Sequence, residues 1–199
     1  AYEALHAAGI ELVAIEAAST DSIYEWREER GSTPYRRITL FPGEVYDELN
    51  PARLFDAMEA TLEEVQPDAV HIHSYATPDA RAALAWTRKN RRTAIVMAES
   101  KADDGPRSWW REAVKRRLVA QFDAAQSAGT RAWHYIQQLG LPGDRIFAGY
   151  SVVNNDYFAE AAEAARQQPD AARTLPGLAD PTPFFLASNR FVERKNLPL

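Results

Sequence analysis

The chain has 199 residues, of which 46% are hydrophobic and 26% charged, as is typical of a globular protein with one domain and part of a second. Its formal charge of −5 argues against a general nucleic-acid binder, because such proteins usually carry a basic face. Cysteine is absent, which excludes disulfides and thiolate metal sites, and no apolar run is long enough to span a bilayer. We therefore expect a cytoplasmic protein that, at most, contacts the inner face of a membrane.

The first third of the chain contains signals for strands and for one well-marked helix. The apolar spacing predicts a helix over residues 1–8 and strands over residues 10–15 and 35–41. The clearest helix covers residues 51–65, because Asn50 can cap it, a proline occupies its first turn and apolar residues recur at helical spacing.

Strands and helices alternate regularly in the middle of the chain. We predict strands over residues 69–73, 93–98, 122–127 and 145–150, and helices over residues 78–89, 107–120 and 130–139. Short connections between such elements are typical of right-handed βαβ units. The fold class is therefore predicted to be α/β, with a Rossmann-like parallel sheet that has helices on both faces.

Proline-rich sequence follows the last of these strands and marks a domain boundary. We expect a first domain over residues 1–155, and a helix with a proline-rich connection over residues 156–182. A second, truncated domain would begin with a strand and loop over residues 183–199.

Polar residues follow two neighbouring strands of the predicted sheet, at the edge where parallel sheets bind ligands. His73 and Ser74 follow the strand over residues 69–73, and Glu99, Lys101 and Arg107 follow the next strand. His73 is a candidate for an active-site role, although strand-end histidines also commonly hydrogen bond to the backbone. A metal site with His71 is disfavoured, because no third ligand stands at a recognisable spacing.

The sequence leaves two interpretations open for Glu99 and Lys101. A carboxylate and an ammonium group at the mouth of a cleft could act together on a substrate hydroxyl group. The alternative is an ordinary salt bridge within a loop, which would contribute little to stability.

The predicted helix over residues 107–120 carries two tryptophans and several cationic residues. We expect its apolar positions, which include Trp109, Trp110 and Val114, to pack on the sheet beneath the stems of the cations. The alternative is that the helix docks on an acidic membrane surface.

Two cations follow the apolar run near the end of the chain. The run Phe184–Ala187 ends in a small polar turn, after which Arg190 and Lys195 stand five residues apart, before a new helix start. A strand followed by a cationic turn is one way in which an α/β sheet binds phosphate, and the alternative is a solvated helix start.

Several segments, in this order, resemble motifs of the family-4 retaining glycosyltransferases of the two-domain GT-B type. The segments that carry the resemblance are Gln66–His73, Phe122–Gly129, Leu139–Phe147, Gly149–Phe158 and Ser188–Asn196. The resemblance covers roughly residues 66–199.

The resemblance implies transfer of a hexosyl group from a nucleotide-diphosphate sugar to a hydroxyl acceptor, such as a glycan or a lipid-linked acceptor, with retention. Arg190 and Lys195 would neutralise the donor diphosphate. On the other wall of the cleft, His73 and Glu99 would be the catalytic groups. The acceptor-side groups there would be Ser74, Lys101 and Arg107. Neither a metal ion nor a further cofactor is implied.

The chain also departs from the family pattern. Glu99 stands where many members have a histidine, and residues 153–155 replace the usual glycine and valine. The N-terminal strand with its glycine-rich loop and the distal glutamate motif are not present, which predicts that this polypeptide is inactive alone. Two alternatives therefore remain, a non-catalytic Rossmann-like binding module and a nucleotide-sugar epimerase of the same fold.

Overall fold

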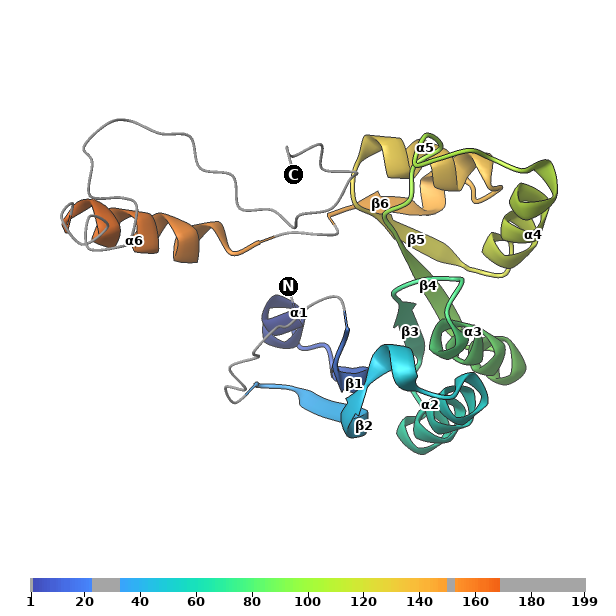
Figure 1. Cartoon of the computed structure of the whole chain (residues 1–199), viewed down its shortest axis with the longest axis horizontal. Coiled ribbons are helices and arrows are strands. Elements are labelled where there is room, and N and C mark those ends of the chain that lie inside the picture. Colours follow the sequence, from blue (N-terminus) through green and yellow to red (C-terminus); the bar gives the residue numbers. More distant parts are fainter. Residues whose placement is uncertain (1, 23–32, 150–152, 169–199) are drawn as a thin grey trace. The chain divides into compact units, whose positions relative to one another are not determined.

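The computed structural model describes residues 2–22, 33–149 and 153–168 (Figure 1). The chain divides into two compact units, residues 1–152 and 153–199. The predicted strand and loop over residues 183–199, with Arg190 and Lys195, lie outside the described residues, as does the connection beyond residue 168.

A small parallel sheet comes first in the chain. Helix α1 (Tyr2–Ala7) precedes strand β1 (Val13–Thr20), which pairs in parallel with β2 (Arg36–Val45). Strand β1 begins at Val13 rather than at residue 10 and continues to Thr20, and β2 continues to Val45 rather than ending at residue 41. The prediction that β2 ends at Phe41 is wrong, because Pro42 and Gly43 are part of the strand, and a β-bulge near Ala18 adjusts the pairing.

A second, larger parallel sheet contains four strands in chain order, which are β3 (Ala69–Ile72), β4 (Thr93–Ala98), β5 (Ala124–Ser127) and β6 (Ile146–Ala148). The connecting helices are α3 (Pro78–Asn90), α4 (Trp109–Val119) and α5 (Thr130–Gln138). Short 3₁₀ helices occupy Tyr46–Glu48 and Gly143–Arg145. The α/β class, with parallel sheets flanked by helices in a Rossmann-like arrangement, is confirmed.

Helix α2 (Pro51–Val65) forms where the sequence predicts it. The side chain of Asn50 accepts hydrogen bonds from the backbone N–H groups of Ala52 and Arg53, which satisfies donors that the first turn leaves unpaired. The helix buries one stripe of Leu54, Met58 and Leu62. Since Leu54 packs with Phe41 of β2 and Leu62 packs in the main core, α2 connects the two sheets.

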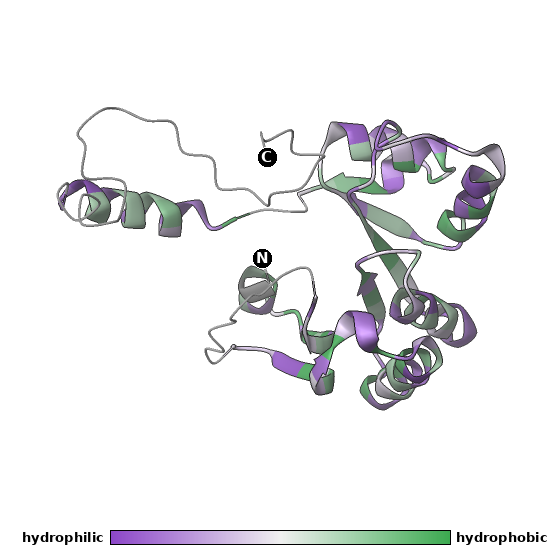
Figure 2. Cartoon of the chain, in the orientation of Figure 1, coloured by the Kyte–Doolittle hydropathy of each residue, from purple (hydrophilic) through white to green (hydrophobic). Residues whose placement is uncertain are grey.

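The main core lies between the four-stranded sheet and its helices. Burial alternates along β4, where Ala94, Val96 and Ala98 are buried and the residues between them are half-buried. Figure 2 shows this strand as largely hydrophobic. Trp86 of α3 is fully buried, and its indole N–H donates to a carboxylate oxygen of Glu63 at 2.8 Å, so α3 is tied to α2. This packing fixes the start of α3 close to the end of β3.

Among the described residues, β1 pairs only with β2 and β3 pairs only with β4, and residues of β1 and β3 line a cavity of about 720 Å³. Helices α2 and α3 contribute Met58, Leu62 and Ala83 to the same cavity. The strands of the expected single sheet are thus divided between two sheets in the described part of the chain.

Helix α6 (Asn155–Arg166) belongs to the second unit, and Asn154 caps it by accepting from the N–H group of Tyr157. None of the helices in the described ranges is both long and apolar enough to cross a membrane.

Candidate functional site

The ends of β3 and β4 bring most of the predicted site residues to one edge of the larger sheet. Ile72 of β3 pairs with Val96 of β4, and Ala98 of β4 pairs with Ser127 of β5. Because the strands are parallel, the residues that follow them emerge at the same edge. His73 and Glu99 are both exposed there.

His73 lies against a buried carboxylate. Its Nε2 atom is 3.6 Å from Oδ2 of Asp79, and its side chain is 52% exposed whereas that of Asp79 is 4% exposed. The hydroxyl group of Thr77 is 3.3 Å from the same Nε2 atom. In the tautomer that carries its proton on Nε2, this proton faces both oxygen atoms, and Nδ1 is the acceptor on the other side of the ring.

Tyr46 holds the second oxygen of that carboxylate. Its hydroxyl group donates to Oδ1 of Asp79 at 3.0 Å. Burial, together with the adjacent negative charge of Asp79, raises the pKa of Tyr46 to about 12, so the hydroxyl continues to donate even at alkaline pH. Asp79 is therefore fixed from one side by Tyr46 and faces His73 from the other.

Two further predicted residues near this edge, Ser74 and Lys101, have polar partners close to them in the sequence. The hydroxyl group of Ser74 accepts from the backbone N–H of Ala76 at 3.1 Å, which shapes the turn into α3. The ammonium group of Lys101 lies 2.9 Å from Oδ1 of Asp104, within its own loop. Their predicted contacts with an acceptor stay predictions.

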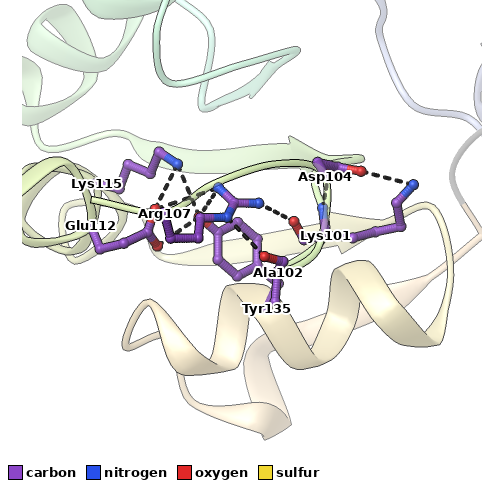
Figure 3. A network of polar contacts seen from close by, with 7 residues as sticks. All are labelled: Lys101, Ala102, Asp104, Arg107, Glu112, Lys115 and Tyr135. Atoms are coloured by element: carbon purple, nitrogen blue, oxygen red, sulfur yellow. Dashed lines mark hydrogen bonds and ion pairs between the residues drawn. The ribbon is translucent and has the colours of Figure 1, made fainter. Parts of the chain in front are cut away.

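Arg107 belongs to a network that joins the loop after β4 to α4 and α5 (Figure 3). Its guanidinium group donates to the carbonyl oxygens of Lys101 and Ala102, and to the hydroxyl group of Tyr135 at 2.8 Å. It also lies over the Tyr135 ring, 4.5 Å from the centroid. Arg107 thus holds the loop in place, in addition to its predicted role on the acceptor side.

Tyr135 is the centre of that network. Its hydroxyl group donates to Oε2 of Glu112 at 2.8 Å and accepts from Nζ of Lys115 at 3.0 Å, and Lys115 also donates to Oε1 of Glu112 at 2.8 Å. Burial opposes ionisation of Glu112, but the hydrogen bonds from Lys115 and Tyr135 outweigh it and lower the pKa of this carboxyl group. Burial likewise opposes the charge on Lys115, and the bonds to Glu112 and Tyr135 raise its pKa.

Tyr75 links the surroundings of His73 to this network. It packs against the main core, and burial raises the pKa of its hydroxyl group, which hydrogen bonds to Ser100 in the loop after β4. The loops after β3 and β4 are therefore held to each other.

A metal site finds no support in the part of the chain that the structure describes, where no three potential side-chain ligands come together. His71 lines the cavity, and partial burial lowers the pKa of its imidazole because it disfavours the charged form. A neutral imidazole of this kind suits a structural histidine as well as a ligand.

The sequence reasoning missed Asp79, Tyr46 and Tyr135. A signal for Asp79 was available, because an acidic residue in the first turn of a helix that follows a strand-end histidine is placed near that histidine. Tyr46 and Tyr135 gave no such signal, since they approach the site only through the packing of the 3₁₀ helix and α5.

Solved structures show a distant likeness. One is described as a UDP-N-acetylglucosamine 2-epimerase, and a second, from Listeria monocytogenes, carries the same enzyme name. Each matches at 14% identity and a TM-score of 0.40 over 54% of this chain, and the chain spans 32% and 30% of their lengths. No curated protein matches the chain.

A family match covers most of the first unit. Residues 1–148 match the family described as glycosyl transferase 4-like domain, and this range includes both sheets, His73 with Asp79 and the network around Tyr135. The chain therefore belongs to the glycosyl transferase 4-like domain family.

Proposed function

We propose that this chain forms the acceptor-side domain of a glycosyltransferase that moves a hexosyl group from a nucleotide-diphosphate sugar to a hydroxyl acceptor with retention. The observation that carries the proposal is the exposed imidazole of His73, which lies against the buried carboxylate of Asp79 in a glycosyl transferase 4-like domain. A buried carboxylate behind an exposed imidazole is a recurrent arrangement for a group that accepts a proton from a hydroxyl.

In the proposed reaction, the bond between the anomeric carbon and the nucleoside diphosphate breaks, and the acceptor oxygen bonds to the anomeric carbon on the face that the diphosphate leaves, which retains the configuration. Nδ1 of His73 takes the proton of the acceptor hydroxyl, and the nucleoside diphosphate departs as the leaving group. Asp79 stabilises the positive charge that develops on the imidazole. Glu99, exposed at the same sheet edge, would orient a neighbouring hydroxyl group of the acceptor, while Ser74 and Lys101 lie on the loops beside it.

The proposed donor-binding residues are inferred from the sequence, because they lie outside the described residues. Arg190 and Lys195 are proposed to neutralise the diphosphate as it leaves, because a planar guanidinium and a compact ammonium group can share its charge. Replacing either residue with alanine should then raise the KM for the donor and lower kcat.

The test uses the full natural polypeptide and a panel of uridine and guanosine diphosphate sugars, with simple glycosides and polyprenyl phosphates as acceptors. His73→Gln should lower kcat by roughly 10²-fold or more, with a smaller change in the KM for the donor. The matched control is His134→Gln, because His134 is an exposed histidine on α5 away from the edge, and it should leave kcat unchanged.

Product analysis distinguishes the proposal from its alternatives. Transfer gives a glycosylated acceptor with the anomeric configuration of the donor. An epimerised sugar without an acceptor would replace the proposal with an epimerase, and binding without turnover of any donor would replace it with a non-catalytic module.

A further inference from the structure

Helix α4 (Trp109–Val119) has its polar and apolar faces reversed with respect to an ordinary surface helix. Its inward side carries Glu112 and Lys115, which bind Tyr135 of α5. Val119 is its only buried residue. The expectation that the apolar positions pack on the sheet is therefore wrong, because a polar network occupies the side that faces the domain.

The outward side of α4 is apolar and large. Trp109 is 84% exposed, Trp110 is 52% exposed and Val114 is 51% exposed. Trp110, Ala113 and Val114 follow the spacing i, i+3 and i+4, so they form one apolar stripe on the helix. An exposed stripe of this kind is costly in water unless another surface covers it.

Cations surround this apolar stripe. Arg111, Arg116 and Arg117 are exposed, and none of them forms an ion pair with another described residue. The guanidinium group of Arg111 lies over the Trp110 ring, 5.2 Å from its centroid. Figure 2 shows strongly hydrophilic and strongly hydrophobic segments on this same short helix.

We propose that the outward side of α4 docks on an anionic lipid bilayer, with Trp109, Trp110 and Val114 in the interface and the three arginines against the lipid headgroups. Tryptophan is favoured at the boundary between headgroups and acyl chains. The charge points to an acidic surface, because three exposed arginines gather on this helix without an ion pair to another described residue, although the chain as a whole carries a formal charge of −5.

This docking does not depend on the proposed sugar transfer. The sheet edge that carries His73 belongs to the same compact unit as α4. The loop after β4 leads directly from Glu99 to α4. Arg107 holds this loop through the carbonyl oxygens of Lys101 and Ala102. Docking would therefore bring the loop near the lipid surface.

The experiment measures co-sedimentation of the full chain with vesicles of pure phosphatidylcholine and with vesicles that contain phosphatidylglycerol. We expect partitioning only onto the anionic vesicles, weakened by salt because the attraction is screened. Arg116→Gln with Arg117→Gln should weaken partitioning by roughly fivefold per charge removed. The control pair, Arg81→Gln with Lys89→Gln, removes two exposed cations of α3 and should leave it unchanged.

A second pair of variants tests the apolar contact. Trp109→Ser with Trp110→Ser should reduce partitioning at least tenfold, whereas Phe147→Ser, another exposed aromatic residue in β6, should not. Circular dichroism verifies that each variant is folded.

Three results would overturn the proposal. One is the absence of partitioning by the wild-type chain onto anionic vesicles. Another is partitioning that the tryptophan variants leave unchanged. The last is a wild-type dimer that these variants dissociate in analytical ultracentrifugation, which would assign α4 to contact with a second copy.

Discussion

Asp79 and His73 pair a buried carboxylate with an exposed imidazole, with 3.6 Å between Oδ2 and Nε2. If the imidazole accepts the proton of the acceptor, Asp79→Asn should lower kcat at least roughly tenfold, because an amide does not stabilise a positive imidazolium as a carboxylate does. Steady-state kinetics should show this loss in kcat, with little change in the KM for the donor. Asp56→Asn, on the exposed side of α2, is the control and should behave as wild type.

Tyr46 should make the protein sensitive to alkaline pH. The unfolded chain releases this proton near pH 10, whereas the folded chain retains it to about 12, so the stability that Tyr46 contributes is complete below pH 10 and is lost as the pH rises from 10 to about 12. In urea titrations across this range, Tyr46→Phe should show a shallower fall in the free energy of unfolding than wild type. Tyr157→Phe replaces an exposed tyrosine and should keep the wild-type slope.

Glu112 should contribute to stability on the acid side. Its pKa is lowered from 4.5, so its contribution is complete above that pH and is lost as the pH falls through the folded-state value. Glu112→Gln should therefore lower the free energy of unfolding at pH 7 and flatten its dependence between pH 5 and the acid transition. A thermal melt series checks this, with the exposed Glu48→Gln as control; equal slopes for the two variants would contradict the role of Glu112.

The free energy of unfolding should fall strongly when a side chain in the main core is shortened. Leu62 is 1% exposed and packs between α2 and α3, so Leu62→Ala should lower the free energy of unfolding by about 2–5 kcal/mol. Leu5→Ala removes the same atoms from a residue that is 38% exposed, and should cost less than about 1 kcal/mol. Chemical denaturation of both variants provides the comparison.

The residues at the N-cap positions of α2 and α4 should contribute differently to stability, although both are small and polar. Asn50 accepts from two backbone N–H groups at the start of α2, and its replacement by alanine should cost about 1 kcal/mol. Ser108 stands at the same position of α4 without a side-chain cap bond, so Ser108→Ala should be nearly neutral. A cost for Ser108→Ala equal to that for Asn50→Ala would show that Ser108 caps α4 in solution.

Much of the secondary structure could be predicted because local signals agreed with each other. For α2, the Asn50 cap, the proline in the first turn and the apolar spacing all indicate the same boundaries. The strand β4 is equally clear, because an unbroken apolar run suits a buried parallel strand. The extension of β2 through Pro42 and Gly43 could not be predicted, since only the pairing with β1 allows it.

The candidate site was predicted in part. The strand-end positions of His73 and Glu99 follow from periodicity, because parallel strands place their carboxyl ends at one edge. The hydrogen bonds of Arg107 do not follow from periodicity, since Tyr135 is distant in sequence and reaches Arg107 from α5.

The sequence by itself determined which elements form, because caps, breakers and apolar spacing act within a few residues of each other. It also placed His73 at the end of a strand. Only the tertiary structure decided what these elements face. The helical pattern of α4 is compatible with an apolar side turned inward or outward, and the bonds of Glu112 and Lys115 to Tyr135 turn it outward. The carboxylate of Asp79 meets His73 for the same reason, since packing of α3 against α2 and β3 sets that distance.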